Sequence, residues 1–216
     1  MVDYGWVQPE SVMSDTATIH IPGPAGQLEA CYTELERKGD AGVICHPHPL
    51  YGGSMDDAVV AALERGMQSR GISTVRFNFR GVMGSEGRHD RGVGEVDDVK
   101  AVMNWLTGEH GAGKFWLAGY SFGAVVAART AATCGFALQQ LILVAPAMQF
   151  PPDLGEFSCP TMVIQGKRDD IVHADQVQEW LASLQSPSDY VELPNADHFF
   201  STELGDIVTA LDGRLA

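Results

Sequence analysis

Apolar residues along the chain follow two patterns, short continuous runs and longer segments with helical spacing. Short runs rich in Val, Ile, Leu and Phe predict buried β-strands, and they lie at residues 16–21, 28–35, 41–46, 72–79, 115–119, 141–147, 160–166 and 189–194. Between most of them, apolar residues recur three and four positions apart, which predicts amphipathic helices at residues 54–71, 93–108, 122–135, 175–187 and 201–213. A turn rich in Pro and Gly joins the first two runs and predicts an antiparallel hairpin.

The order of these segments predicts the fold class. After the hairpin, apolar strands alternate with helices, which is typical of an α/β fold with a mostly parallel sheet covered on both faces. We expect about eight strands in this sheet. No repeat, low-complexity tract or linker divides the chain, so residues 1–216 are expected to form a single domain. Only residues 148–159 separate two late strands, which is too short for a helical lid.

Residue types at the helix ends predict where the helices begin and end. Ser54, with Asp57 three residues later, predicts a capping box at the start of the first helix. Gly71 is expected just beyond the end of that helix. Asp175 is the expected N-cap of the fourth helix, and the second helix is expected to stop at Gly108.

Composition narrows the possible partners. The formal net charge is −14 and no basic stretch offsets it, which argues against nucleic acid or an anionic membrane as a partner. The four cysteines lie far apart and form no C-x-x-C motif, which argues against a zinc ribbon and favours reduced thiols. No segment has the pattern of a signal peptide or the apolar length of a membrane span. We therefore expect a soluble cytoplasmic protein, either a monomer or a homodimer.

The strongest candidate for chemistry is the motif GYSFG, residues 119–123. It follows a predicted strand and opens a predicted helix, which is the strand–turn–helix setting of a nucleophile elbow. Small residues on both sides allow the sharp turn that exposes the hydroxyl of Ser121. The start of the helix favours negative charge developing nearby. Ser121 is therefore the candidate nucleophile, and a buried serine in a tight turn is the plain structural alternative.

A serine hydroxyl needs a base to take its proton and a third group to orient that base. His198 lies in a predicted loop between the last strand and the last helix, and Asp169 and Asp170 directly follow another strand. Serine, acid and histidine then follow each other in one of the known chain orders of a catalytic triad. Because these loops follow the carboxyl ends of strands, we expect all of them at the edge of the sheet that carries Ser121.

These motifs together give the chain a resemblance to a known family. From AGVICHPHPLYGG through FNFRGVMGSEG and GYSFG to ADHFF, nearly the whole chain resembles the α/β-hydrolases. It is most similar to small lidless bacterial serine hydrolases with an H-P-H-P loop, related in style to dienelactone hydrolases. The latter use cysteine as the nucleophile, so the serine here speaks against that specific activity. The resemblance implies an α/β-hydrolase fold and no metal or organic cofactor.

Carried onto this chain, the family pattern makes Ser121 the nucleophile and His198 the base. The acid of the family lies at the aspartate of a G-x-x-D turn, which is Asp169 here. Asp170 remains the alternative on spacing. Asp197 is a weaker candidate because adjacent residues rarely present their side chains to each other.

The loop HPHPLYGG, residues 46–53, raises the question of a metal site or a backbone role. In the family, this position supplies one N–H group of the oxyanion hole, and the residue after the nucleophile, Phe122, supplies the other. His48 is the expected donor from the loop, with Leu50 and Tyr51 as alternatives. His46 is then expected to hold the loop through hydrogen bonds.

The metal interpretation requires more ligands than the two histidines of this loop, since an open zinc site has three protein ligands. His89, Asp56 and Asp57 are available in the sequence, but they belong to a different loop and to a helix start. We therefore expect no metal, and a metallohydrolase built on His46 and His48 remains the less favoured alternative.

Arg80 follows another strand within the glycine-rich segment FNFRGVMGSEG. It is a candidate for binding a substrate carboxylate through two hydrogen bonds. A structural role is favoured, in which Arg80 pairs with Glu95 or Asp98 and holds the loop.

Apolar residues on the loops at this edge are candidates for a substrate pocket, and we expect them to be Leu50, Tyr51, Met148 and Phe199, with Met83, Phe150 and Phe200 as further candidates. The expected function is hydrolysis of a small carboxylic ester through an acyl-enzyme, with a small-molecule ester or thioester as the partner. A thioesterase, lactonase or peptidase would use the same three residues. A non-catalytic binding protein of the same fold is a further alternative.

Overall fold

The computed structural model describes residues 16–35, 39–148 and 158–215. Within this part, the strands are β1 (Thr16–Gly23), β2 (Gly26–Thr33), β3 (Asp40–Cys45), β4 (Ser73–Phe77), β5 (Lys114–Tyr120), β6 (Leu138–Val144), β7 (Thr161–Gly166) and β8 (Ser188–Leu193). The helices are α1 (Ala58–Gln68), α2 (Gly94–His110), α3 (Phe122–Thr133), α4 (Ala174–Ser183) and α5 (Leu204–Leu211), with one 3₁₀ turn, η1 (Pro49–Tyr51).

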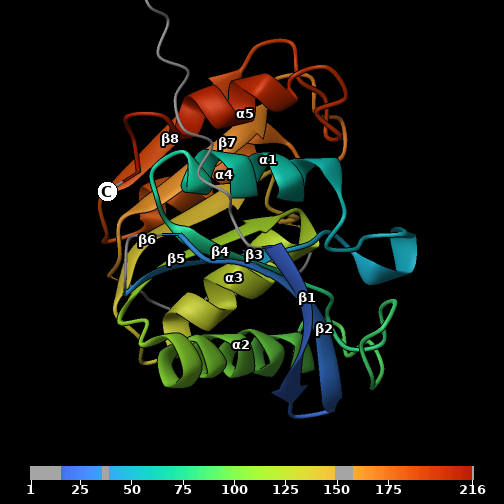
Figure 1. Ribbon diagram of the computed structural model, residues 1–216. Helices are drawn as coiled ribbons and strands as arrows, with labels where there is room; N and C mark the ends of the chain where they lie inside the picture. Colours follow the sequence, from blue (N-terminus) through green and yellow to red (C-terminus); the bar gives the residue numbers. More distant parts are fainter. Residues whose placement is uncertain (1–15, 36–38, 149–157, 216) are drawn as a thin grey trace, which may run out of the picture.

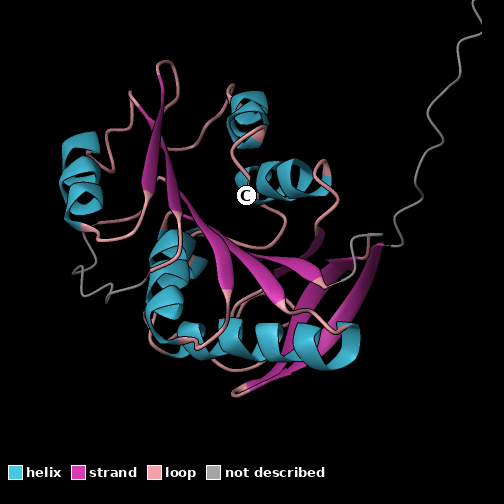
Figure 2. Cartoon of the chain, turned by 90° about the vertical axis from the view of Figure 1, so that its left-hand side faces the viewer, coloured by secondary structure: helices cyan, strands magenta, loops and turns pink. Residues whose placement is uncertain are grey.

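The strands join into one sheet in the order β1-β2-β4-β3-β5-β6-β7-β8. β1 pairs with β2, and β2 with β4, in antiparallel orientation, whereas every pair from β4 to β8 is parallel. The prediction of a mostly parallel sheet of about eight strands with an antiparallel hairpin at its start is confirmed. Figure 2 shows the twist of this sheet, with helices on both sides of it.

Two apolar cores lie on the two faces of the sheet, as the continuous apolar strands require. Side chains of α1 and α5 pack on one face and those of α2, α3 and α4 on the other. In Figure 1, α1 and α5 lie above the sheet and α2 and α3 lie below it. Strand β5 shows how one strand serves both layers, because Trp116 belongs to one core and Leu117 to the other.

The parallel register brings distant loops to one edge of the sheet. Cys45 at the end of β3 lies beside Gly119 near the end of β5, and Gly166 at the end of β7 lies beside Leu193 at the end of β8. The loops that follow these four strands therefore leave the sheet at the same edge. This arrangement is what the sequence predicted for the candidate site, and it follows from the common direction of the strands.

Several predicted helix ends are wrong. Helix α1 is capped by Asp57, whose Oδ1 accepts the N–H of Val59 at 2.8 Å, so Ser54 is not the cap. Helix α2 continues past Gly108 to His110 and ends at the left-handed Gly111, because an isolated glycine inside an amphipathic helix is tolerated. In α4, Asp175 lies in the first turn and His173 occupies the N-cap position.

The connection between β6 and β7 carries no helix in the part that the structure describes, and its length in the sequence leaves no room for a lid domain. A lidless fold is therefore confirmed. Even the longest helix of the described ranges lacks an apolar stretch sufficient to span a bilayer.

Candidate functional site

Ser121 lies between β5 and α3, at a sharp turn with φ 54° and ψ −115°. This backbone conformation is strained for a residue with a side chain. A Cβ atom on Gly123 would collide with the carbonyl oxygens of Cys45 and His46, and one on Gly119 would collide with the backbone of Gly123. Both flanking glycines are therefore required by close approach, which is the geometry that the GYSFG motif predicted.

The imidazole of His198 connects Ser121 to Asp169. Oγ of Ser121 lies 3.1 Å from Nε2 of His198, and Nδ1 of His198 lies 2.8 Å from Oδ2 of Asp169. Because the carboxylate is buried and only accepts hydrogen bonds, Nδ1 carries the proton and Nε2 accepts from the serine hydroxyl. The structure thus brings together three residues that the sequence predicted to meet.

Four hydrogen bonds hold the carboxylate of Asp169. Its Oδ1 accepts the N–H groups of Ile171 and Val172, and its Oδ2 accepts from His198 and from the amide of Gln165. Burial acts to raise the pKa of Asp169, but the hydrogen bonds from His198 and the backbone prevail and hold that pKa below its ordinary value. Asp169 is therefore a stable anion behind the imidazole.

The two other aspartates considered for this position do not contact the imidazole in the structure. Asp170 is exposed, and Asp197 directs its Oδ1 to the N–H of Phe199 at 3.0 Å. Of the candidates left open by spacing, Asp169 is the one that the fold places against His198.

Tyr120 is a site residue that the sequence analysis missed. Its hydroxyl donates to the backbone carbonyl of His198 at 2.8 Å, and its ring lies beside the rings of His198 and Phe200. Burial raises its pKa, so the phenol keeps its proton and remains a donor. The signal for Tyr120 in the sequence was its position directly before Ser121 in the GYSFG motif, because β5 ends at this edge of the sheet.

His46 holds the loop between β3 and α1. The side chain is fully buried, its Nδ1 lies 2.7 Å from the carbonyl oxygen of Pro47, and its Nε2 accepts the N–H of Phe79 at 3.0 Å. Burial lowers the pKa of His46 to about 4, so the ring is neutral at ordinary pH. Both nitrogens serve the loop, as the sequence predicted. In the described ranges, no three His, Cys, Asp or Glu side chains are arranged to hold a metal ion.

The N–H groups of the loop that follows His46 are largely used inside it. Leu50 donates to Nδ1 of His48 at 3.2 Å, and Tyr51 donates to the carbonyl of His48 at 3.0 Å. Gly52 and Gly53 also donate to loop carbonyls. These bonds argue against Leu50 and Tyr51 as oxyanion donors. The ring of His48 lies 4.9 Å from that of Phe122, centroid to centroid, so the two predicted donor residues are neighbours.

A cavity of about 730 Å³ opens beside Ser121 and His198. Of the predicted pocket residues, Tyr51 and Phe199 line it, whereas Leu50 and Met148 do not. Leu50 points into solvent and Met148 packs against the core on the α2–α3 face. The full lining comprises Pro47, His48, Tyr51, Gly52, Gly53, Asp57, Tyr120, Ser121, Phe122, Ala147, Ile171, His198 and Phe199.

The further pocket candidates are also placed elsewhere or not described. Phe200 is fully buried under Tyr120, and Met83 is exposed on its own loop, away from the cavity lining. Phe150 lies outside the described residues. The apolar pattern alone did not distinguish a side chain that faces the cavity from one that packs beneath it, because both kinds occupy the same loops.

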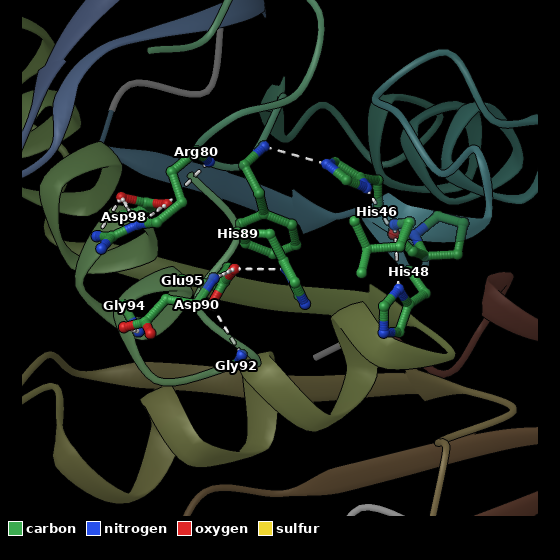
Figure 3. A network of polar contacts seen from close by, with 12 residues as sticks. His46, His48, Arg80, His89, Asp90, Gly92, Gly94, Glu95 and Asp98 are labelled. Atoms are coloured by element: carbon green, nitrogen blue, oxygen red, sulfur yellow. Dashed lines mark hydrogen bonds and ion pairs between the residues drawn. The ribbon is translucent and has the colours of Figure 1, made fainter. Parts of the chain in front are cut away.

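Two buried carboxylates hold the loop between β4 and α2 (Figure 3). Asp98 pairs with Arg80, with Nη2 of the guanidinium 2.7 Å from Oδ1. Glu95 accepts the N–H groups of Asp90 and Gly92, and its Oε1 lies 2.8 Å from Nδ1 of His89. The structural interpretation of Arg80 is thus the correct one, with Asp98 as its partner.

This pairing predicts a stability effect. Asp98 is fully buried, and burial raises its pKa while Arg80 opposes the rise. In Asp98→Ala the guanidinium of Arg80 loses its partner, and we expect the free energy of unfolding to fall by about 3–5 kcal/mol. The control is Asp97→Ala, because Asp97 is exposed on the same helical turn; its cost should stay within about 1 kcal/mol. Urea unfolding of both variants checks this, and equal losses would contradict it.

Comparisons with known proteins agree with this geometry. A family model described as an alpha/beta hydrolase domain matches residues 48–210. A structure of an alpha-beta serine hydrolase homologue from Coxiella burnetii is 40% identical, covers 95% of this chain and 99% of its own, and superposes with a TM-score of 0.87. A lidless α/β serine hydrolase from Xanthomonas campestris is 37% identical, with 91% and 92% coverage and a TM-score of 0.82.

An uncharacterized protein of Rickettsia prowazekii is also similar, with 31% identity over 91% of this chain and 87% of its own length. The family model and these relatives span most of the chain, including the turn at Ser121 and the loop of His198. On this basis the chain belongs to the α/β-hydrolase family and is a hydrolase of that fold.

Proposed function

We propose that this protein hydrolyses small carboxylic esters through an acyl-enzyme intermediate on Ser121. One observation carries the proposal. The imidazole of His198 lies within hydrogen-bonding distance of both Oγ of Ser121 and the buried carboxylate of Asp169, and this arrangement opens into a cavity large enough for a small ester. A binding module has no need of a nucleophile, a base and an orienting acid in contact.

The proposed reaction has two halves. His198 takes the proton of Ser121 as the hydroxyl attacks the ester carbonyl, and His198 then returns the proton to the leaving alcohol. A water molecule, activated by the same imidazole, attacks the acyl-enzyme and releases the acid. Asp169 keeps the proton on Nδ1 and stabilises the imidazolium that forms in each half. Each step of this reaction involves the substrate, water and side chains of this chain.

The negative oxygen of each tetrahedral intermediate needs hydrogen-bond donors. The N–H of Phe122 lies at the first turn of α3, where the helix dipole favours negative charge. The N–H of His48 is the proposed second donor, because its neighbours Leu50 and Tyr51 donate inside the loop. In other acyl-transfer enzymes, one such donor contributes on the order of 10²–10³ in turnover.

A thioester is the second candidate substrate, since the same three residues would cleave either bond. The short connection between β6 and β7 favours an open site and small acyl groups, and the exposed rings of Tyr51 and Phe199 form its rim. These features favour a freely diffusing small molecule as the partner. They do not favour a long-chain lipid, which needs a longer apolar channel.

The experiment that tests this proposal is a matched panel of oxygen esters and thioesters with acyl chains from two to twelve carbons. Purified protein is assayed for kcat/KM on each, and Ser121→Ala serves as the control. We expect the highest kcat/KM for oxygen esters with short chains. Equal or greater activity on thioesters would favour the second candidate, and a folded protein inactive on the whole panel would contradict the proposal.

A further inference from the structure

The charge of the cavity beside Ser121 is one-sided. Among the lining residues that the structure describes, Asp57 is the acidic one, and none is Lys or Arg. The remaining lining is aromatic, aliphatic or glycine, apart from the histidines and Ser121. An anion in such a half-enclosed, partly apolar space loses hydration and finds no cation to replace it.

Asp57 is held in place by its role at the start of α1. Its Oδ1 accepts the N–H of Val59 at 2.8 Å, so the carboxylate cannot swing away without uncapping the helix. Burial raises the pKa of Asp57, and the N–H groups of Val59 and Val60 oppose that rise by stabilising the carboxylate. The cavity wall therefore holds the carboxylate of Asp57 in a fixed position.

Three basic residues at this edge are held by other partners. Arg80, the candidate of the sequence analysis for binding a substrate carboxylate, pairs with Asp98. Lys167 lies 3.2 Å from Glu192, and Arg168 donates to Asn195 at 3.1 Å. None of these three residues lines the cavity, and neither do the exposed Arg88 and Arg91 of the loop between β4 and α2.

We propose that Asp57 sets the charge selectivity of this site, so that neutral and cationic acyl groups are accepted and anionic acyl groups are rejected. The proposal rests on the proposed function, because it takes the Ser121 cavity as the substrate site. It narrows the substrate class to esters of uncharged or positively charged acids. Two unit charges across a cavity near a protein surface interact strongly enough for an effect of about tenfold on binding, and salt weakens it.

The test uses three 4-nitrophenyl esters with acyl chains of similar length: the neutral pentanoate, the anionic monoglutarate and the cationic 4-(trimethylammonio)butanoate. For each, kcat/KM is measured at low and at high ionic strength. The variant is Asp57→Asn, because asparagine caps a helix as well as aspartate does and removes only the charge. For each protein we take the ratio of kcat/KM between two esters. Dividing the ratio of the variant by that of the wild type cancels the intrinsic reactivities of the esters.

The matched control is Asp56→Asn, which makes the same change one residue away. Asp56 is exposed, pairs with Arg76 and does not line the cavity. We expect Asp57→Asn to raise the ratio of anionic to neutral kcat/KM about tenfold at low salt, and Asp56→Asn to leave it unchanged. An unchanged ratio in Asp57→Asn, equal changes in both variants, or a wild-type preference for the monoglutarate would overturn the proposal.

A binding measurement separates this proposal from the proposed function. Anilides of the same three acids are titrated calorimetrically into Ser121→Ala protein, with and without Asp57→Asn. If no ester is hydrolysed, the proposed function fails, and the anilide affinities still decide the role of Asp57. The proposal is supported if the anionic anilide binds more weakly than the neutral one and Asp57→Asn reduces this difference. It is overturned if the affinity does not depend on the charge of the anilide, or if Asp57→Asn does not change it.

Discussion

Replacing Ser121 with alanine should lower kcat for an activated ester by a factor on the order of 10⁴–10⁶, towards the uncatalysed rate. Losses of this size are typical when the nucleophile of a triad is removed, because the remaining residues have no covalent step left to assist. The variant lacks only the Oγ that lies 3.1 Å from His198, and alanine fits the turn between Gly119 and Gly123. We therefore expect the loss of activity without loss of the fold.

The measurement is the steady-state hydrolysis of a short-chain 4-nitrophenyl ester, together with thermal unfolding followed by circular dichroism. Ser54→Ala is the matched control, because Ser54 lies near this edge but does not line the cavity. Activity of Ser54→Ala should stay near that of the wild type. A Ser121→Ala protein that retains more than a tenth of the wild-type kcat would show that the hydrolysis occurs elsewhere.

Asp169→Asn should lower kcat by about 10²–10⁴, with a much smaller change in KM. An asparagine can direct its NH₂ group at Nδ1 of His198, which would place the imidazole proton on Nε2, facing Ser121. In that tautomer the ring cannot accept the proton of the hydroxyl. The same variant loses the anionic acceptor of the N–H groups of Ile171 and Val172.

Asp170→Asn is the control for this prediction, since Asp170 is adjacent and exposed. It should keep nearly full activity, and comparable losses in the two variants would contradict the assignment of Asp169.

Acid unfolding gives a second readout of the role of Asp169. Because the pKa of Asp169 is lowered in the folded protein, its contribution to stability is present at neutral pH and is lost as the pH falls through that lowered value. In Asp169→Asn this pH-dependent contribution to the free energy of unfolding should be absent.

Much of the site followed from the sequence because its geometry is imposed by the sheet. Parallel strands bring the residues that follow them to one edge, so the strand ends predicted that Ser121, His198 and an aspartate after β7 would meet there. The choice of Asp169 over Asp170 came from the family's G-x-x-D pattern. The two glycines around Ser121 indicated the turn in the same way, because only small residues allow the approach of the loop at Cys45. The partner of Arg80 was left open between Glu95 and Asp98, since one turn of helix separates them.

The parts that could not be predicted depend on side-chain direction. Leu50 and Met148 share the apolar character of Tyr51 and Phe199, yet only the latter two line the cavity. Helix boundaries failed for a related reason, because both Ser54 and Asp57 are good caps and the loop conformation decides which one is used. Asp57 was interpreted as part of a capping box or as a possible metal ligand, and its place in the cavity wall depends on packing that no local pattern reveals.

The central claim, that the chain makes a covalent bond to substrate at one serine, is tested most directly by a fluorophosphonate followed by peptide mass spectrometry. The account predicts stoichiometric labelling of the folded protein, with the added mass on Ser121 and no labelling of Ser121→Ala. A label on any other residue, or a folded wild-type protein that remains unlabelled while it hydrolyses esters, would contradict it.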